Sequence, residues 1–280
     1  MRTSRLLVLS TRAARMTPEV DARLRLEFPG YKFVGLGAVR RISRLISPRG
    51  TVLVARGDGT VGAVVRLLAD SMCRIGIIPL GTFNNFADAL RVPEDIDRAI
   101  DVVKKGRSRS ITLCRVNGVV FLEACALGLF GETIRLGELA KVRRLRGIGP
   151  RIRNVLAAKP FKYVLSKDLV GSGTAMSLVF GNTYSTGYRL PLGDTTPADR
   201  YLEFSVHAGS THVDIAGRAL ASALLDKHRE EGAGQVFRFR SLGVTTVPRV
   251  RAFADHVPAG RTPLTVTAEL SRLKFILPKR

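Results

Sequence analysis

The chain has 280 residues, of which 45% are hydrophobic and 24% charged, as is typical of a globular protein with one large domain or two ordinary ones. Its net charge is +22, which favours anionic partners such as lipid, nucleotide or nucleic acid. Three cysteines lie in apolar runs without a zinc-binding spacing, which predicts buried free thiols in a reducing compartment. Since no run of about 18 apolar residues occurs and Arg12 interrupts the first apolar run too early for a signal peptide, we expect a cytoplasmic protein.

The first hundred residues alternate between short apolar strands and helices. Strands are predicted at residues 5–10, 31–36, 51–55 and 75–80, and helices at 18–28, 38–46, 60–72, 84–90 and 94–105. Such alternation is typical of an open, mostly parallel sheet that is covered by helices. We therefore predict an α/β domain over residues 1–110.

Short strands dominate after residue 110. They are predicted at residues 110–116, 119–127, 161–166, 174–182, 201–208, 235–240, 245–254, 264–270 and 273–277, with helical patterns at 133–159 and 213–231. Asn117-Gly118 between the first two strands is a strong signal for a tight hairpin. We predict a mainly antiparallel β-sandwich domain over residues 111–280.

Residues 52–62 read VLVARGDGTVG and contain Gly57, Gly59 and Gly62 at the spacing of a dinucleotide-binding fingerprint. That fingerprint requires an acidic residue about 20 positions further on, at the end of the next strand, to hold the ribose. The next strand instead ends in Leu80-Gly81-Thr82. A dinucleotide site is therefore disfavoured.

The next strand leads into a second glycine motif, PLGTFNNFA at residues 79–87. GDGT followed by PLGTxNxFA at this spacing resembles the diacylglycerol kinase catalytic-domain family, which includes bacterial lipid kinases and sphingosine kinases and is more distantly similar to NAD kinases. Weaker matches extend the resemblance over nearly the whole chain: VNGVVFLEACALGLF at 116–130, Gly181-Asn182 followed by Pro197-Ala198-Asp199, and Asp255 where the family has Asp-Gly-Glu.

The resemblance implies a kinase that uses ATP and Mg²⁺ to phosphorylate a hydroxyl of diacylglycerol or a related lipid. Its implied nucleotide-binding residues are Arg56, Gly57, Asp58, Gly59, Thr60, Gly81, Thr82 and Asn84. The glycines let backbone amides approach phosphate, and the helix starting near Thr60 presents partial positive charge to it. The implied catalytic residues are Asp58, which would orient Mg²⁺-bound water, and Asp255, the general base; Asp199 is a weaker candidate metal ligand.

Several motif residues depart from the family pattern. Arg56 replaces the first glycine of GGDGT, Ser10-Thr11 replace Asn-Pro, Asn85 and Thr112 replace acids, Arg200 replaces a glycine, and His256-Val257 replace Gly-Glu. Arg56 would be strained if its φ were positive, or it would offer its guanidinium to phosphate. Asp255 has the alternative role of a turn residue before Pro258, and His256 either assists it or lies in a solvated loop.

These lost acids favour an alternative function, a catalytically weak family member that binds nucleotide or lipid as a sensor or accessory protein. The intact GDGT and PLGT motifs and Asp255 favour the enzyme.

Residues 135–167 contain ten basic residues and one acid, Glu138, mixed with apolar residues at near-helical spacing. Such a segment can lie on an anionic bilayer or form a solvated helical face. Because the chain has no Trp and few aromatic residues, a nucleic-acid partner is disfavoured. We expect a lipid substrate at an anionic membrane surface and peripheral association with the inner membrane face; the oligomeric state stays open.

Overall fold

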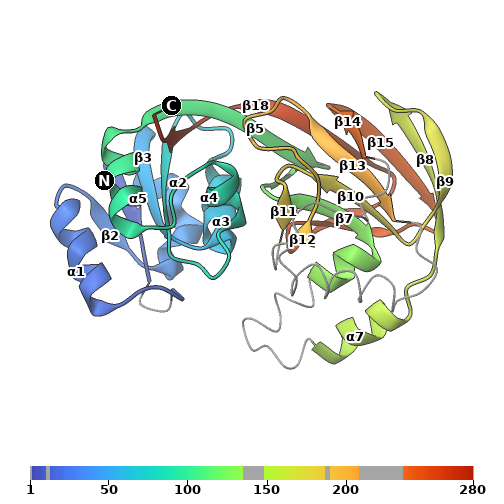
Figure 1. The fold of residues 1–280 in the computed structure, drawn as a ribbon, viewed down its shortest axis with the longest axis horizontal. Coiled ribbons are helices and arrows are strands. Elements are labelled where there is room, and N and C mark those ends of the chain that lie inside the picture. The colour runs from blue at the N-terminus through green and yellow to red at the C-terminus, as the bar shows by residue number, and fades with distance from the viewer. Residues whose placement is uncertain (1, 11–12, 135–147, 187–189, 208–235, 280) are drawn as a thin grey trace. The chain divides into compact units, whose positions relative to one another are not determined.

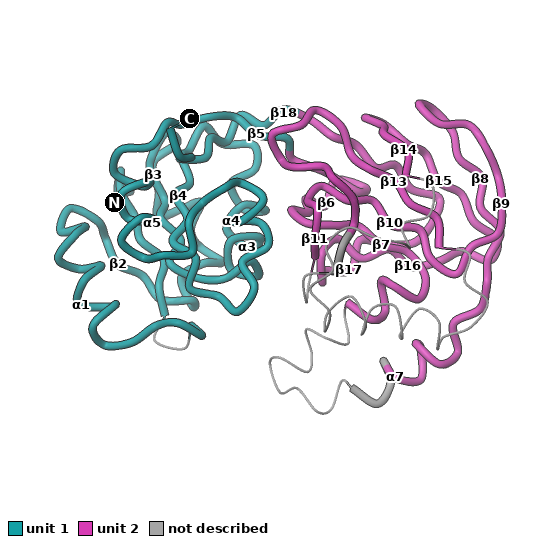
Figure 2. Tube along the Cα trace, viewed as in Figure 1, with its two compact units in different colours: residues 1–112, 270–280 teal, residues 113–269 magenta. Residues whose placement is uncertain are grey.

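The computed structural model describes residues 2–10, 13–134, 148–186, 190–207 and 236–279. The chain forms two compact units (Figure 2): unit 1 contains Met1–Thr112 and Leu270–Arg280, and unit 2 contains Leu113–Glu269. The expected boundary near residue 110 lies two residues from the end of the first segment. The expected second domain differs in one respect, because the last eleven residues of the chain belong to unit 1.

Unit 1 is built on a parallel sheet with the strand order β2-β1-β3-β4-β18. The strands are β1 (Thr3–Val8), β2 (Lys32–Val34), β3 (Ile46–Arg56), β4 (Arg74–Pro79) and the second half of β18 (Leu264–Leu277). Its helices are α1 (Pro18–Glu27), η1 (Leu36–Arg41), α2 (Ile42–Leu45), α3 (Asp58–Leu68), α4 (Asn85–Ala89) and α5 (Ile96–Lys105) (Figure 1). The predicted α/β architecture is confirmed.

The region predicted as one helix over residues 38–46 is instead a 3₁₀ helix followed by a single α-helical turn. Ile46 already belongs to β3, where it pairs with Thr3 of β1. Pairing with a strand more than forty residues away overrides the local helical periodicity, which is a weak preference by comparison.

The C-terminal strand helps to hold the core of unit 1 together. Lys274 N–H of β18 donates to the Cys73 carbonyl at 3.0 Å, just before β4 begins. The Phe275 ring packs edge-on against Phe86 of α4, with ring centroids 5.8 Å apart, and both side chains are fully buried. The last strand of the chain therefore supports the helix that follows the PLGT motif.

Unit 2 contains two antiparallel sheets. One is formed by β8 (Phe161–Lys167), β9 (Gly171–Ala175), β15 (Ser241–Val247) and the first half of β18, and the other by β7 (Ala124–Gly128), β10 (Ser177–Gly181), β13 (Leu202–His207), β14 (Val236–Phe239), β16 (Arg251–Ala254) and β17 (Val257–Arg261). Phe161 and Leu242 from the first sheet share one core with Phe180 and Phe204 from the second. This shared core confirms the predicted sandwich.

The remaining elements include the predicted hairpin. β5 (Arg107–Val116) runs from unit 1 into unit 2 and pairs with β6 (Val119–Phe121) across Asn117-Gly118, whose φ values of 47° and 81° suit a two-residue turn. Helix α7 (Ile148–Leu156) and the short strands β11 (Ser185–Thr186) and β12 (Leu190–Pro191) complete the described part. The helical pattern at 213–231 lies outside the described residues. Within the described ranges, no helix is both long and apolar enough to cross a membrane.

The packing of Phe275 generates a stability prediction. Phe275→Ala should destabilise unit 1 by about 3–5 kcal/mol, because it removes a fully buried aromatic ring, whereas Leu270→Ala on the same strand should cost little since Leu270 is 57% exposed. In a urea titration, labelling of the buried Cys73 thiol reports the unfolding of unit 1. Peptide mapping distinguishes it from labelling of Cys114 and Cys125, which reports the unfolding of unit 2. Equal midpoints for the two variants would show that β18 does not stabilise unit 1.

Candidate functional site

The two glycine loops lie at the carboxyl ends of neighbouring strands. Arg56, the last residue of β3, pairs with Pro79, the last residue of β4, and the two strands are parallel. Gly57 then caps α3, and residues 80–84 lead into α4. The loops that follow adjacent parallel strands meet at one edge of the sheet, where open α/β folds bind their ligands.

The backbones of Gly57 and Gly81 touch. A Cβ built on Gly57 would lie 2.8 Å from the Gly81 Cα, and a Cβ on Gly81 would lie 2.5 Å from the Gly57 Cα and 2.6 Å from the Asn84 Oδ1. Only residues without a side chain allow the two loops to approach this closely. The glycines of the two motifs therefore fix the spacing of the loops to each other.

Asn84 closes the second loop on itself. Its Oδ1 accepts from the Gly81 N–H at 2.9 Å, and its Nδ2 donates to the Gly81 carbonyl at 3.1 Å. Asn84 adopts the left-handed region at φ 53°, a conformation that asparagine tolerates better than most residues. Because Asn84 is buried while Thr82 is exposed, the amide shapes the loop and the threonine remains accessible.

Asp58 joins the two loops from the other side. It is the first residue of α3, and its carboxylate accepts from the Asn85 N–H at 3.0 Å and the Phe86 N–H at 3.3 Å, the first amides of α4. Asp58 therefore caps a helix 27 residues further along the chain. This structural role is one that sequence reasoning missed; orientation of Mg²⁺-bound water by Asp58 stays a prediction.

The start of α3 offers backbone donors to an anion. Gly57 has no side chain with which to cap the helix, and its carbonyl accepts from Thr60 N–H at 3.0 Å and Val61 N–H at 3.2 Å. Gly59, in the first turn, is exposed. An eleven-residue helix that starts in this way carries partial positive charge at an accessible end, which favours phosphate.

Arg56 lies beside this helix start without backbone strain. It is a strand residue and is not among the described residues with positive φ, so the strained alternative is excluded. Its Nε donates to the Thr60 Oγ1 at 3.4 Å, while its Nη1 is buried and has no hydrogen-bond partner. Burial lowers the pKa of the guanidinium, although an arginine stays charged. A cation with an unused buried donor is unfavourable unless an anion supplies the acceptor.

Asp255 occupies the turn between β16 and β17, with φ 53°. Its Oδ1 accepts from the N–H groups of Leu122, Glu123 and Ala124 at 3.2, 2.9 and 3.3 Å, and its Oδ2 accepts from Leu122 N–H at 3.1 Å. The aspartate thus holds the chain in the bend between β6 and β7. His256 follows it in the same turn and is partly buried. The structure shows this turn role, and the general-base role stays a prediction.

The same bend is held from its other side by Asn182. The fully buried Asn182 donates through Nδ2 to the Leu122 carbonyl and through its own N–H to the Glu123 carbonyl, both at 2.8 Å. Its Oδ1 is buried and has no hydrogen-bond partner. The Glu123 side chain, 9% exposed, accepts from Thr186 Oγ1 at 2.8 Å. Both residues lie in stretches that match the family, but neither was among the predicted site residues.

Asp199 serves as a local turn cap. Its Oδ2 accepts from the Thr196 N–H at 2.8 Å and from the Thr196 Oγ1 at 3.0 Å. Across the described residues, no three His, Cys, Asp or Glu side chains are grouped so as to hold a metal ion. The structure thus brings residues 56–60 and 81–84 together in unit 1. Asp199 and Asp255 lie in separate turns of unit 2.

The contact between Gly57 and Gly81 generates a binding prediction. Gly81→Ala should weaken ATP binding at least tenfold, because the added methyl group meets backbone that cannot turn away, and the two loops must separate. Gly35→Ala is the matched control, since a Cβ at Gly35 meets no atom within 4 Å. Calorimetric titration measures both affinities, with circular dichroism as the check on folding. A folded Gly81→Ala protein with unchanged affinity would show that the loop contact is unrelated to nucleotide.

Comparison with known proteins identifies part of the chain. Residues 17–116 match the model of the diacylglycerol kinase catalytic domain. A Staphylococcus haemolyticus protein named "Putative lipid kinase SH2167" is 32% identical over 156 residues, which are 53% of this chain and 50% of that protein. A Yersinia pestis protein named "Probable lipid kinase YegS-like" is 33% identical over 146 residues, 49% of each chain. The matched region therefore spans about half the length of these curated relatives.

Solved structures extend the likeness in fold to the whole chain. The crystal structure of a diacylglycerol kinase from Bacillus anthracis has a TM-score of 0.75 at 18% identity, over 98% of this chain and 97% of that one. A further Bacillus anthracis structure gives a TM-score of 0.74 at 20% identity with the same coverage. Residues 17–116, which contain both glycine motifs, carry the match to the diacylglycerol kinase catalytic-domain family.

Proposed function

We propose that this chain is a lipid kinase that transfers the γ-phosphoryl group of ATP to a hydroxyl of diacylglycerol or a related lipid. The observation that carries the proposal is the pair of touching glycine loops at the ends of β3 and β4, within the segment that matches the kinase family. The names of the relatives as lipid kinases support the same reaction class.

The nucleotide phosphates would bind at the start of α3. Phosphoryl transfer depends mainly on positioning and on stabilisation of negative charge. The exposed helix start at Gly59 supplies partial positive charge, and Arg56 supplies a full positive charge with an unmet donor at its buried Nη1. The Gly81–Asn84 loop, fixed by Asn84, would present its exposed Thr82 to the same ligand.

Asp58 would act as a positioning residue in this reaction. Its carboxylate connects the α3 start to the α4 start, so the two phosphate-binding loops move as one body. This role requires a charged or polar acceptor at position 58 but no contact with the reacting atoms. It also explains why an aspartate is compatible with a site for an anion.

Mg²⁺ would neutralise charge on the phosphates when it is bound with the nucleotide. The described carboxylates do not themselves fit a protein-held Mg²⁺ site. Asp58, Asp199 and Asp255 each accept hydrogen bonds from backbone amides, and no cluster of three ligands occurs among the described residues. We therefore propose that the cation is held mainly by the nucleotide, as is common for Mg²⁺, and assign it to no residue of the chain.

The candidate general base lies in unit 2. We propose Asp255, held in place by the backbone amides of Leu122, Glu123 and Ala124, as the general base for the lipid hydroxyl. The orphaned Oδ1 of Asn182, on the other side of the same bend, is an acceptor suited to a substrate hydroxyl. Both groups are positioned by the Leu122–Ala124 backbone.

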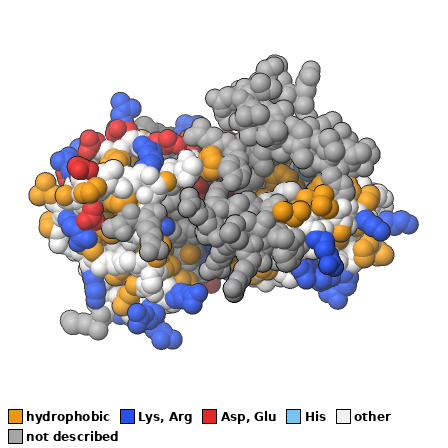
Figure 3. Space-filling model, turned by 90° about the horizontal axis from the view of Figure 1, so that it is seen from below, with side chains coloured by type: hydrophobic (Ala, Val, Ile, Leu, Met, Phe, Trp, Pro, Cys, Tyr) orange, Lys and Arg blue, Asp and Glu red, His pale blue; other side chains and the backbone are white. Residues whose placement is uncertain are grey.

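The membrane proposal draws on α7. Ile152 and Leu156, one helical turn apart, are 44% and 68% exposed, and the basic Arg153 lies beside them on the helix. An apolar and basic helix surface of this kind favours the interface of an anionic bilayer. Figure 3 shows basic and apolar side chains together over unit 2. Residues 135–147, which hold five of the ten basic residues of the predicted segment, lie outside the described residues.

A second function, as a nucleotide-binding sensor or accessory protein, is favoured by one observation. Each of the three aspartates predicted to take part in catalysis or metal binding has a structural role in a helix cap or turn. A protein that had lost catalysis would retain such residues for folding alone.

An assay of lipid phosphorylation separates the two functions. Purified protein with labelled ATP and Mg²⁺ should label a lipid in vesicles that contain diacylglycerol, monoacylglycerol or a sphingoid base. Asp58→Ala should lower the rate at least a hundredfold because α4 loses its cap, while Asp101→Ala, an exposed acid on α5, should leave it unchanged. No labelling of any lipid, together with measurable ATP binding, would favour the sensor. Full activity in Asp58→Ala would contradict the proposed site.

The buried Nη1 of Arg56 generates a prediction about metal dependence. The wild-type protein should bind ATP measurably in the presence of a chelator, because a fixed positive charge is already present beside the phosphates. Arg56→Gly should lose at least tenfold more affinity than wild type when Mg²⁺ is removed, and Arg56→Lys should fall between them. Calorimetric titration with and without EDTA tests this. An identical response of all three proteins would make Arg56 a bystander.

A further inference from the structure

The hairpin formed by β16 and β17 places two arginines directly opposite each other. Arg251 and Arg261 are cross-strand partners in its register. Like charges at directly opposed positions repel and disfavour the pairing of the strands. A counter-charge between them would remove this cost.

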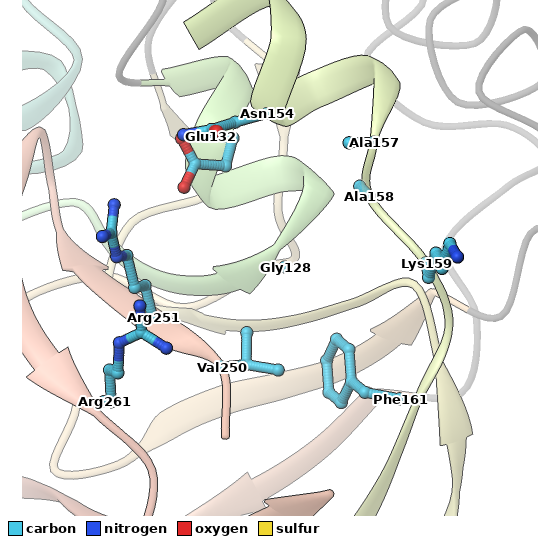
Figure 4. Close-up of a pocket in the computed structure, with 10 residues that line it drawn as sticks. All are labelled: Gly128, Glu132, Asn154, Ala157, Ala158, Lys159, Phe161, Val250, Arg251 and Arg261. Carbon is cyan, nitrogen blue, oxygen red and sulfur yellow. The ribbon is translucent and has the colours of Figure 1, made fainter. Parts of the chain in front are cut away.

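Both arginines line the same two cavities, each of about 340 Å³. In Figure 4 their side chains lie at one side of the first cavity, with Phe161 across from them and Glu132 near Asn154 above. Lys159 adds a third basic residue to this cavity. Both arginines are exposed, so a ligand reaches them without rearrangement of the core.

The described residues provide no ion-pair partner for this arginine pair. Arg261 Nη1 donates to the Arg249 carbonyl at 3.5 Å, a long contact with a neutral acceptor. Glu132, the carboxylate among the described lining residues, accepts from Asn154 Nδ2 at 3.4 Å. The cavity therefore combines excess positive charge with donors suited to an external anion.

The lining also has an apolar part. Phe161, Val250, Ala157 and Ala158 line the first cavity, and Phe253 and Pro258 line the second. A ligand that fits would carry an anionic group for the arginines and an organic portion for this surface. A volume of a few hundred Å³ suits a small ligand or a headgroup.

We propose that Arg251 and Arg261 form a phosphate-binding site in unit 2 that receives an organic phosphate, either a soluble phosphate ester or the headgroup of an anionic phospholipid. Two planar guanidinium groups on facing strands match the oxygens of one phosphate and bind it in a bidentate manner. The bound anion also neutralises the like charges of the hairpin, so binding and hairpin stability are coupled.

The site is separate from the residues of the proposed reaction. Arg251 is the first residue of β16, and Asp255 follows the end of that strand, four residues on, which is roughly 13 Å along an extended chain. Asp255 lies at the turn of the hairpin and the arginine pair at its open end. The proposal therefore holds whether or not the chain proves to be a kinase.

Binding to two kinds of probe tests the site in the intact protein. Calorimetry with glycerol 3-phosphate tests the soluble source, and co-sedimentation with phosphatidylcholine vesicles, with and without phosphatidylglycerol, tests the lipid source. The Arg251→Gln/Arg261→Gln variant is compared with Arg107→Gln/Arg109→Gln, which removes the same charge from two exposed positions on β5. Both variants keep the glycine loops of unit 1, so any phosphate binding there is the same in both. The difference in affinity between the two variants therefore measures binding at the cavity.

The expected result is an affinity at least tenfold weaker for the Arg251/Arg261 variant in one of the two arms, with the control within twofold of wild type. The arm that responds identifies the source of the phosphate. Arg251→Lys/Arg261→Lys keeps the charge and should fold. Because it lacks the planar guanidinium forks, it should still lose most of the affinity that the glutamine variant loses. Equal binding by the glutamine variant and the control in both arms, or full binding by the lysine variant, would overturn the proposal.

Discussion

The contact between the Gly57 and Gly81 backbones is the constraint on which the site in unit 1 depends. A side chain at either position would separate the loops, since its Cβ would lie within 2.8 Å of backbone. The polar contacts around the glycines are consistent with that closeness: Asn84 closes one loop on itself, and Asp58 caps α4 from the first residue of α3. Two strand ends thereby become one rigid cradle of amides, with the Arg56 guanidinium beside it.

Polar side chains also fix the backbone in the bend between β6 and β7 in unit 2. Asp255 holds its amides and Asn182 holds its carbonyls, so the backbone of Leu122–Ala124 is fixed by side chains from two different strands or turns. Polar residues that resemble catalytic residues therefore also maintain the fold. Loss of other acids from the family pattern, as at Asn85 and Thr112, does not disturb these contacts.

Local patterns in the sequence were sufficient for the architecture of unit 1, the sandwich of unit 2 and the Asn117-Gly118 hairpin, because strand periodicity and turn chemistry are encoded by neighbours in the chain. They failed where contacts between residues far apart in the sequence determine the bounds and the pairing of strands and helices. The apolar run at 119–127 is one strand by pattern, but the Asp255 turn, more than 130 residues away, breaks it at Leu122 and Glu123. The return of β18 to unit 1 and the capping of α4 by Asp58 likewise depend on residues that only folding brings together.

The central claim is that the paired glycine loops bind the phosphates of a nucleotide. Hydrogen exchange of the intact protein, with and without saturating ATP, tests it most directly, since it reports on backbone amides without requiring turnover. Bound ATP should slow exchange in peptides that cover residues 57–62 and 81–86 and leave exchange unchanged in the β8 peptide 161–167 of unit 2. Bound ATP that left both loop peptides unprotected would contradict the account.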